Sequence, residues 1–290
     1  MTKQQWKERL DKGIVYMDGA TGSNLQKKGM KRGTCAEKWI LEHEDMVYEL
    51  QKQYLEVGSH ILLAPTFMAN HFYLGKYGLE NQIEEINTRL VQISKRAAGQ
   101  NGLVAGNMTT TGKRSAPIGT VAFQELVDLY KEQAQHLVKA GVDLFCIETM
   151  IYLEEAKSCI LAIKEVCDLP IFVSMIYKED GRTICGTDME MVIKTFEQLR
   201  VDAVGMNCIK GKTMLPLLRE MKQYTKMPIL VKPNAGLPEH IDGKNVYPVT
   251  PEQFAYEGQQ LVEAGASIIG GCCGTTPEYI KLLVERTIRK

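Results

Sequence analysis

Short apolar segments rich in β-branched residues alternate with longer amphipathic segments along the whole chain, and this alternation restricts the fold more than any other feature. Eight segments have the composition of strands, and a segment with helical spacing of apolar residues follows each of them. Strands separated by helices pair in parallel, because each helix returns the chain to the starting edge of the sheet. The predicted strands are 14–21, 60–67, 103–108, 143–150, 171–177, 203–208, 229–234 and 267–272, and the predicted helices are 45–57, 81–98, 122–140, 152–166, 188–199, 213–225, 251–265 and 276–289.

Eight strand–helix repeats within 290 residues predict an α/β fold, a single (β/α)8 TIM barrel that spans residues 1–290 as one domain. The alternative is an open doubly wound sheet, which would show fewer strands and an early glycine-rich phosphate loop. No linker or low-complexity segment divides the chain. Residues 27–42 and 237–249 read as long loops on the functional face of the barrel, after the first and seventh strands.

The charge balance and composition argue against several classes of protein. The formal net charge is zero, with 35 basic and 35 acidic residues, so we expect neither nucleic acid nor a membrane surface as partner. No apolar run approaches the roughly 20 residues of a membrane span, and residues 1–7 predict a charged helix rather than a signal peptide. Eight cysteines are too few for a disulfide scaffold of this length and suit a reducing cytoplasm.

Two adjacent cysteines, Cys272 and Cys273, follow the last predicted strand in the segment 270–277, Gly-Gly-Cys-Cys-Gly-Thr-Thr-Pro. Consecutive strand residues point to opposite faces, so both sulfurs can face one point only if the strand breaks. The surrounding glycines permit the backbone angles that such a break needs. Two convergent thiolates suit a soft metal ion, most often zinc.

A third cysteine, Cys208, holds the equivalent place at the end of the predicted strand 203–208. Three thiolates leave one tetrahedral position of a zinc ion open, which is typical of catalytic rather than structural sites. We therefore predict one zinc ion per chain, bound by Cys208, Cys272 and Cys273. The alternative is a set of separate buried thiols, since free cysteine is commonly buried.

Further polar residues end the other predicted strands, and in barrels of this kind the catalytic groups gather at those ends. Asn234 lies on the strand between the two that carry the cysteines, so we predict it either as a labile fourth zinc ligand or as a hydrogen-bond partner of the substrate. The remaining residues at the predicted mouth are Asp18, Gly19, Ala20, Thr21, Gly22, Thr66, Asn107, Glu148 and Ser174.

The carboxylates Glu148 and Asp18 end apolar strands, where an unpaired buried charge is costly. We expect Glu148, and similarly Asp18, to have a cationic partner; a substrate ammonium group would serve, and a structural salt bridge is the alternative. The glycine-rich turn 19–22 can direct backbone N–H groups at an anion such as a carboxylate. These features together suit an amino acid that also carries a thiol, with its sulfur on zinc.

Six short motifs carry a resemblance to a known family: 17–22 Met-Asp-Gly-Ala-Thr-Gly, 65–67 Pro-Thr-Phe, 147–149 Ile-Glu-Thr, 205–208 Gly-Met-Asn-Cys, 233–236 Pro-Asn-Ala-Gly and 270–275 Gly-Gly-Cys-Cys-Gly-Thr. Through them, nearly the whole chain resembles the homocysteine S-methyltransferase family. The segments 186–188 Gly-Thr-Asp and 233–236 are most similar to the homocysteine module of cobalamin-dependent methionine synthase.

The resemblance implies a zinc-bound homocysteine thiolate that accepts a methyl group to give methionine. It implies methylcobalamin or another methylcorrinoid as the donor, supplied in trans by a corrinoid protein. S-methylmethionine, S-adenosylmethionine or a betaine would suit other members of the family. A non-catalytic zinc or thiol-binding protein is the alternative of a different class.

Two segments depart from the family pattern at the predicted mouth. Residues 106–112 read Gly-Asn-Met-Thr-Thr-Thr-Gly, where family members often have an acidic or small residue with Ile-Gly-Pro. Lys232 replaces the acidic or aromatic residue that often precedes the proline of 233–236. Both departures concern the acceptor and donor sides of the site more than the predicted zinc ligands.

Overall fold

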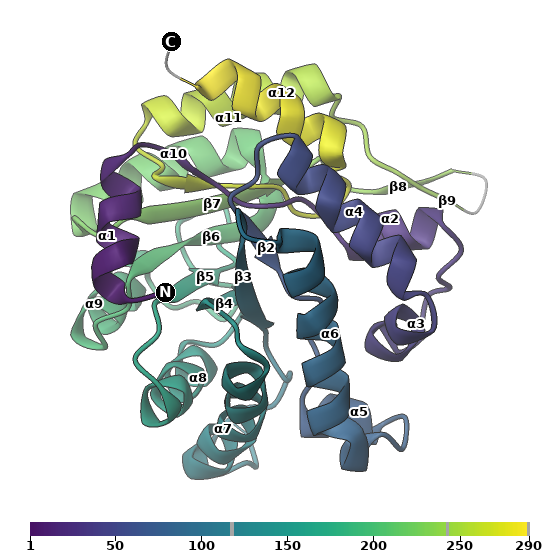
Figure 1. Ribbon diagram of the computed structural model, residues 1–290. Coiled ribbons are helices and arrows are strands. Elements are labelled where there is room, and N and C mark those ends of the chain that lie inside the picture. The colour runs from purple at the N-terminus through teal and green to yellow at the C-terminus, as the bar shows by residue number, and fades with distance from the viewer. Residues whose placement is uncertain (117–118, 242–243, 289–290) are drawn as a thin grey trace.

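The computed structural model describes residues 1–116, 119–241 and 244–288, and in them eight parallel strands form one sheet that curls into a barrel (Figure 1). The strand order is β1-β10-β7-β6-β5-β4-β3-β2. The strands are β1 (Val15–Tyr16), β2 (Ile61–Leu63), β3 (Leu103–Met108), β4 (Leu144–Met150), β5 (Ile171–Met175), β6 (Ala203–Lys210), β7 (Ile229–Asn234) and β10 (Ile268–Ile269).

The sheet closes where β1 meets β2. Met17 forms a parallel bridge with Ile61, and the N–H of Asp18 donates to the carbonyl of Ile61 at 3.0 Å. One residue pair of this kind leaves the seam short, but it brings the first and second strands together. The predicted (β/α)8 barrel is confirmed.

Helices surround the sheet, and one main helix follows each strand along the chain. They are α4 (Glu44–Glu56), α6 (Ile83–Ala98), α7 (Phe123–Ala140), α8 (Leu153–Val166), α9 (Met189–Gln198), α10 (Gly211–Tyr224), α11 (Pro251–Glu263) and α12 (Pro277–Thr287). The predicted helices match these within a few residues; residue 289 of the last one lies outside the described residues. Thr250 caps α11 by accepting from the N–H of Gln253, and Pro251 takes the first helical position.

The core has two layers, because alternate residues of each strand face the barrel interior and the surrounding helices. The inner layer includes Leu63, Ala105, Cys146 and Leu230. The N-terminal helix α1 (Lys3–Asp11) lies at the amino end of the strands, where the ring of Trp6 packs on that of Phe172 at 4.5 Å between centroids. The amino end is therefore filled with apolar side chains.

The two predicted loops at the carboxyl end carry regular structure. Helix α2 (Gly22–Lys27) ends where the segment 27–42 begins, and α3 (Ala36–Glu42) forms its last part. Helix α5 (His71–Gly75) and a short 3-10 helix (Glu80–Gln82) follow β2. The segment 237–249 contains an antiparallel hairpin, β8 (Glu239–Ile241) and β9 (Lys244–Val246), although residues 242–243 lie outside the described part. These short elements are stabilised by contacts with the barrel and are too short to show a periodic apolar pattern, so apolar spacing does not predict them. In Figure 1 the hairpin and α2 lie on the same side of the barrel.

Candidate metal centre and the adjoining cavity

The three predicted zinc ligands converge at the carboxyl end of the barrel. The sulfurs of Cys208, Cys272 and Cys273 all lie within 4.8 Å of one another, and those of Cys208 and Cys273 are 4.0 Å apart. β6 bends at this point, because Cys208 has a φ of 61° and the pairing of β6 with β7 shifts between Asn207 and Lys210. The left-handed conformation turns the Cys208 side chain toward the turn after β10.

The turn after β10 is held by backbone contacts to both neighbouring strands. The N–H of Gly271 donates to the carbonyl of Asp18 at 3.0 Å, and the N–H of Cys272 donates to that of Pro233 at 2.8 Å. Gly274 has a φ of 86°, and a Cβ there would run into the ring of Tyr247. The glycines therefore allow the strand to break as the sequence predicted, so that both sulfurs face one point.

The cluster has the chemistry of a soft-metal site. Hydrogen bonds from the thiols of Cys272 and Cys273 lower the pKa of Cys208, and the same hydrogen bonds, together with burial and the charge on Cys208, raise the pKa of both donors. One thiolate therefore forms readily, whereas ionisation of the other two thiols requires a cation that offsets the repulsion between the thiolates. Tetrahedral zinc with sulfur at about 2.3 Å would need sulfurs about 3.8 Å apart. The observed spacing fits zinc with small adjustments.

Asn234 ends β7 beside the cluster. Its side-chain nitrogen lies 3.8 Å from the sulfur of Cys208, and its side-chain oxygen is buried without a hydrogen-bond partner. A buried amide oxygen without a partner is costly, so a ligand at this position would relieve it. Both roles predicted for Asn234, zinc ligand and substrate partner, remain predictions.

Asn207 is a contributor that the strand-end rule did not single out. It is fully buried, and its oxygen accepts from the Thr149 N–H and the Ser174 hydroxyl, both at 2.8 Å. Its nitrogen donates to the Thr149 hydroxyl at 2.8 Å and lies 3.9 Å from the Cys272 sulfur. Asn207 thus links β4, β5 and β6 directly behind the cluster. The only signal was its place beside Cys208 in the segment 205–208.

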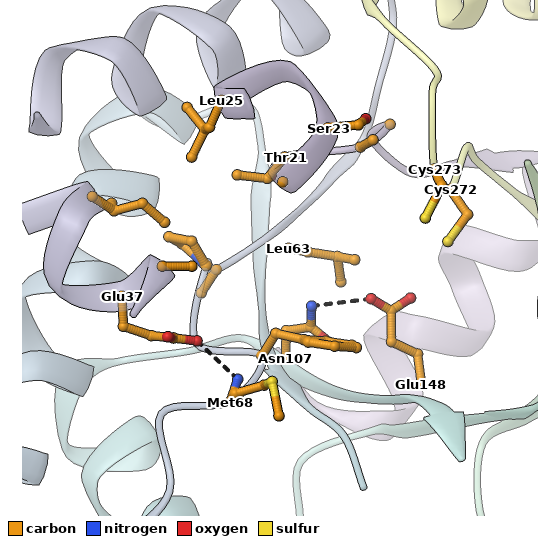
Figure 2. Close-up of a pocket in the computed structure, with 18 of the residues that line it drawn as sticks. Thr21, Ser23, Leu25, Glu37, Leu63, Met68, Asn107, Glu148, Cys272 and Cys273 are labelled. Carbon is orange, nitrogen blue, oxygen red and sulfur yellow. Dashed lines mark hydrogen bonds between the residues drawn. The ribbon is translucent and has the colours of Figure 1, made fainter. Parts of the chain in front are cut away.

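A cavity of about 270 Å³ opens from the cluster toward α2 and α3. Figure 2 shows Cys272 and Cys273 on one side of the cavity and Leu25 and Glu37 on the other. This volume is slightly below the roughly 300 Å³ at which the range for small-molecule sites begins. The residues that line the cavity include Gly19, Ala20, Thr21, Gly22, Glu37, Met68, Asn107, Glu148, Lys232, Cys272 and Cys273.

The predicted anion-binding turn 19–22 forms part of this cavity wall. Its backbone is tightly held, because the N–H of Ala20 donates to the Thr275 hydroxyl at 3.1 Å and the hydroxyl of Tyr54 donates to the Ala20 carbonyl at 3.0 Å. A Cβ on Gly19 would lie 2.6 Å from the Tyr54 hydroxyl oxygen. The turn is therefore rigid, and the amide of Ala20 is occupied within the protein.

Asp18 and Thr66 lie behind the cavity wall rather than in it. One oxygen of Asp18 accepts from the N–H of Leu63 at 2.9 Å, and the other has no partner. Burial raises the pKa of Asp18 to about 7, against the opposing effect of Lys232. The hydroxyl of Thr66 donates to the carbonyl of Asn107 at 2.9 Å. Direct contact of either residue with a substrate stays a prediction.

Glu148 has the cationic partner that its burial demanded, and that partner is Lys232. The ammonium nitrogen of Lys232 lies 2.7 Å from one oxygen of Glu148, and the side-chain amide of Asn107 donates to the other at 3.1 Å. Burial lowers the pKa of Lys232, but the neighbouring carboxylates outweigh it and raise that pKa overall. The sequence marked Lys232 only as a departure from a pattern, because its partner is 84 residues away.

Comparison with known proteins places the chain in a family. The model of the homocysteine S-methyltransferase family matches residues 15–287. Methionine synthase from Mycobacterium leprae is 28% identical over 301 residues, with 97% of this chain and 25% of the relative covered. Methionine synthase from Mycobacterium tuberculosis is also 28% identical, with 94% of this chain and 24% of the relative covered.

A similar fold occurs in the metallated form of the homocysteine methyltransferase MmuM from Escherichia coli. It has a TM-score of 0.82 and 22% sequence identity, over 96% of this chain and 98% of that one. The family match covers most of the sequence, so the chain belongs to the homocysteine S-methyltransferase family. The chain spans about a quarter of the length of the methionine synthases that it matches. Within the described residues, no helix is both long enough and apolar enough to cross a membrane.

Proposed function

We propose that this chain transfers a methyl group to the sulfur of homocysteine, giving methionine, with one zinc ion held by Cys208, Cys272 and Cys273. The observation that carries the proposal is the convergence of three cysteine sulfurs within 4.8 Å at the wall of a small-molecule cavity. Family membership supports homocysteine as the acceptor.

The reaction needs an ionised sulfur, because the thiolate is the nucleophile and a free thiol is mostly protonated at neutral pH. Zinc, when bound by three thiolates, favours the deprotonated form of a further sulfur ligand. A bond then forms between the acceptor sulfur and the methyl carbon, while the bond from that carbon to the donor breaks. No side chain of the protein has to act as a general base if the proton leaves on binding.

The residues of the chain orient the acceptor beside the cluster. We propose that the rigid turn 19–22, Glu148 and Asn234 contact the amino acid portion, whereas Asp18 and Thr66 shape the wall from behind through Leu63 and Asn107. The side-chain oxygen of Asn234, which has no hydrogen-bond partner, offers a contact to the acceptor next to the sulfur of Cys208. Such positioning is worth several kcal/mol in transfer reactions.

We propose a methylcorrinoid as donor, delivered by a corrinoid protein to the open carboxyl end of the barrel. The similarity to methionine synthases supports this choice over S-methylmethionine, S-adenosylmethionine or a betaine. The identity of the donor can be tested independently of the acceptor chemistry.

The proposal is tested on zinc-loaded protein by X-ray absorption at the zinc edge and by methionine formation with a panel of donors. Adding homocysteine should raise the sulfur shell from three to four ligands. Cys208→Ala should lower zinc affinity by more than about 100-fold, beyond the effect of outer-shell changes. Cys185→Ala is the control, because Cys185 is exposed.

An unchanged three-sulfur shell at saturating homocysteine would contradict the proposed function. Cys146 lies in the barrel interior and is not among the proposed ligands. If Cys208→Ala keeps its zinc while Cys146→Ala loses it, the ligand assignment is wrong.

A further inference from the structure

Lys232 is the basic residue among those that line the cavity. Its side chain is 3% exposed and lies on β7, two residues before Asn234. A buried ammonium group keeps its charge only with partners that replace water. The Lys232 ammonium group could bind carboxylates of the protein alone, or it could also bind an anionic group of a substrate.

Glu148 uses only part of the hydrogen-bonding capacity of Lys232. A lysine ammonium has three N–H donors, and that of Lys232 donates at 2.7 Å to one oxygen of Glu148. Within the described residues, the other two donors have no hydrogen-bond partner. They are therefore available to an acceptor oxygen that enters the cavity.

The carboxylates of the wall are already engaged. Glu148 accepts from Lys232 with one oxygen and from Asn107 with the other, and Figure 2 shows its carboxylate on the side of Cys272 and Cys273. Because Lys232 already neutralises Glu148, an entering ammonium group would gain little net attraction from Glu148 and would lie near a like charge.

Glu37, at the far end of the cavity, is engaged in the same way. Its oxygens accept from the N–H of Met68 at 3.0 Å and from the thiol of Cys35 at 3.7 Å. Apart from the cysteines, the described residues of the wall offer an entering ligand one cation with free donors, the neutral side-chain oxygen of Asn107 as an acceptor, and no unpaired carboxylate.

We propose that Lys232 binds the acid group of the acceptor, so that the site selects thiols carrying a carboxylate or a similar anion and does not require the amino group. This inference rests on the proposed function and reverses the polarity expected from the sequence, in which Asp18 and Glu148 hold the ammonium group. Homocysteine satisfies it through its carboxylate. Thiols of similar length with an acid group and no amino group form the wider substrate class.

Two analogues of homocysteine separate the roles of its charged groups. 4-Mercaptobutyrate lacks the amino group, and 3-mercaptopropylamine lacks the carboxylate. Binding of each to zinc-loaded protein is measured by calorimetry, with homocysteine as reference. We expect 4-mercaptobutyrate to bind within about threefold of homocysteine and 3-mercaptopropylamine to bind about 10- to 100-fold more weakly, the loss that charge-assisted hydrogen bonds produce.

Variants of the pair test whether Lys232 is the cause. Lys232→Met leaves Glu148 without its cation, and it should reverse the preference in favour of 3-mercaptopropylamine. Since an unpaired buried carboxylate can destabilise the fold, Lys232→Met combined with Glu148→Gln removes both charges and should abolish the preference. Lys178→Met is the control, because Lys178 is exposed and pairs with Asp180.

The outcomes distinguish this inference from the proposed function. If no thiol binds the zinc-loaded protein, the proposed function fails and the inference fails with it. If 3-mercaptopropylamine binds as tightly as 4-mercaptobutyrate, or if the charge-free double variant keeps the wild-type preference, the inference alone is overturned. Zinc content is measured for each variant, so that a lost metal ion is not mistaken for a lost acid contact.

Discussion

At the scale of single residues, three ionisable groups are buried in or behind the cavity wall, where charging all of them is costly because water is excluded. Lys232 and Glu148 are joined at 2.7 Å and neutralise each other. Asp18 is fully buried, with one oxygen lacking a partner. Burial therefore raises its pKa to about 7, so Asp18 takes up its proton near neutral pH.

The Asp18→Asn variant should show this in the metal-free, reduced protein. The folded-state pKa lies above the ordinary value of 3.8, so the native state keeps a proton that the unfolded chain loses, and stability falls as pH rises from about 4 through 7. Asparagine has no charge to lose. We expect its stability advantage over wild type, measured by urea unfolding, to grow by about 2–3 kcal/mol from pH 5 to pH 8.

The control for this prediction is Asp180→Asn. Asp180 is exposed, and its pKa is lowered by hydrogen bonds from the Arg182 N–H and from Lys178. Its replacement should bring no stability advantage that grows toward pH 8. A stability difference for Asp18→Asn that does not change with pH would show that Asp18 is ionised throughout this range.

At the scale of elements, β4 and β6 both leave regular geometry at the carboxyl end of the barrel. Thr149 and Cys208 have φ values of 62° and 61°, and the pairing of each strand with its neighbour shifts there. Asn207 joins the two bends through the Thr149 backbone and hydroxyl. Non-glycine residues in this conformation are strained, and strain of this kind is concentrated at functional sites.

The close approach of β6 and β7 depends on Gly205. A Cβ at this position would clash with the backbone carbonyl of Leu230, which cannot move without disturbing β7. Gly205→Ala should therefore lower the free energy of unfolding by about 3 kcal/mol and weaken zinc binding, because β6 and β7 carry Cys208 and Asn234. Chemical denaturation and metal titration measure the two effects.

Gly106→Ala is the matched control on β3. A Cβ there would approach the side chains of Leu137 and Phe145 at 3.2 Å and 3.4 Å, and side chains can shift where a backbone carbonyl cannot. We expect a cost of about 1 kcal/mol and unchanged zinc affinity. Equal costs at the two glycines would contradict the role given to the β6–β7 contact.

At the scale of the whole molecule, one end of the barrel is filled and the other carries the site. Trp6 and Phe172 pack at the amino end, whereas α2, α3 and the hairpin β8–β9 accompany the cysteine cluster at the carboxyl end. In the proposed reaction, a donor would therefore reach the homocysteine sulfur from the carboxyl end. A large donor such as a corrinoid can reach it only if α2, α3 and the hairpin β8–β9 leave enough space.

A donor comparison tests this expectation. With zinc-loaded protein and homocysteine, the initial rate with a methylated corrinoid protein or methylcobalamin should exceed that with S-methylmethionine, S-adenosylmethionine or a betaine at matched concentration. Methionine formation is the measurement. Turnover with S-methylmethionine or a betaine, and none with any methylcorrinoid, would exclude the corrinoid as donor and leave the zinc–thiolate chemistry intact.

The sequence by itself determined the barrel and the residues at its mouth. Apolar spacing is a local property, so the strands and helices are predictable, and a residue at the end of a strand is known to face the mouth once the barrel is known. Cys208, Cys272 and Cys273 were predicted to converge on this basis, and the structure brings their sulfurs together.

Only the tertiary structure decided which side chains meet across the barrel. Lys232 and Glu148 are 84 residues apart, and Asn207 and Thr149 are 58 apart. Their pairing depends on strand register, on the bends of β4 and β6 and on the distance between strands, none of which is visible in apolar spacing. The partner of Glu148, and with it the charge that a substrate meets, therefore follows from packing, because a charge has its effect through the groups nearest in space.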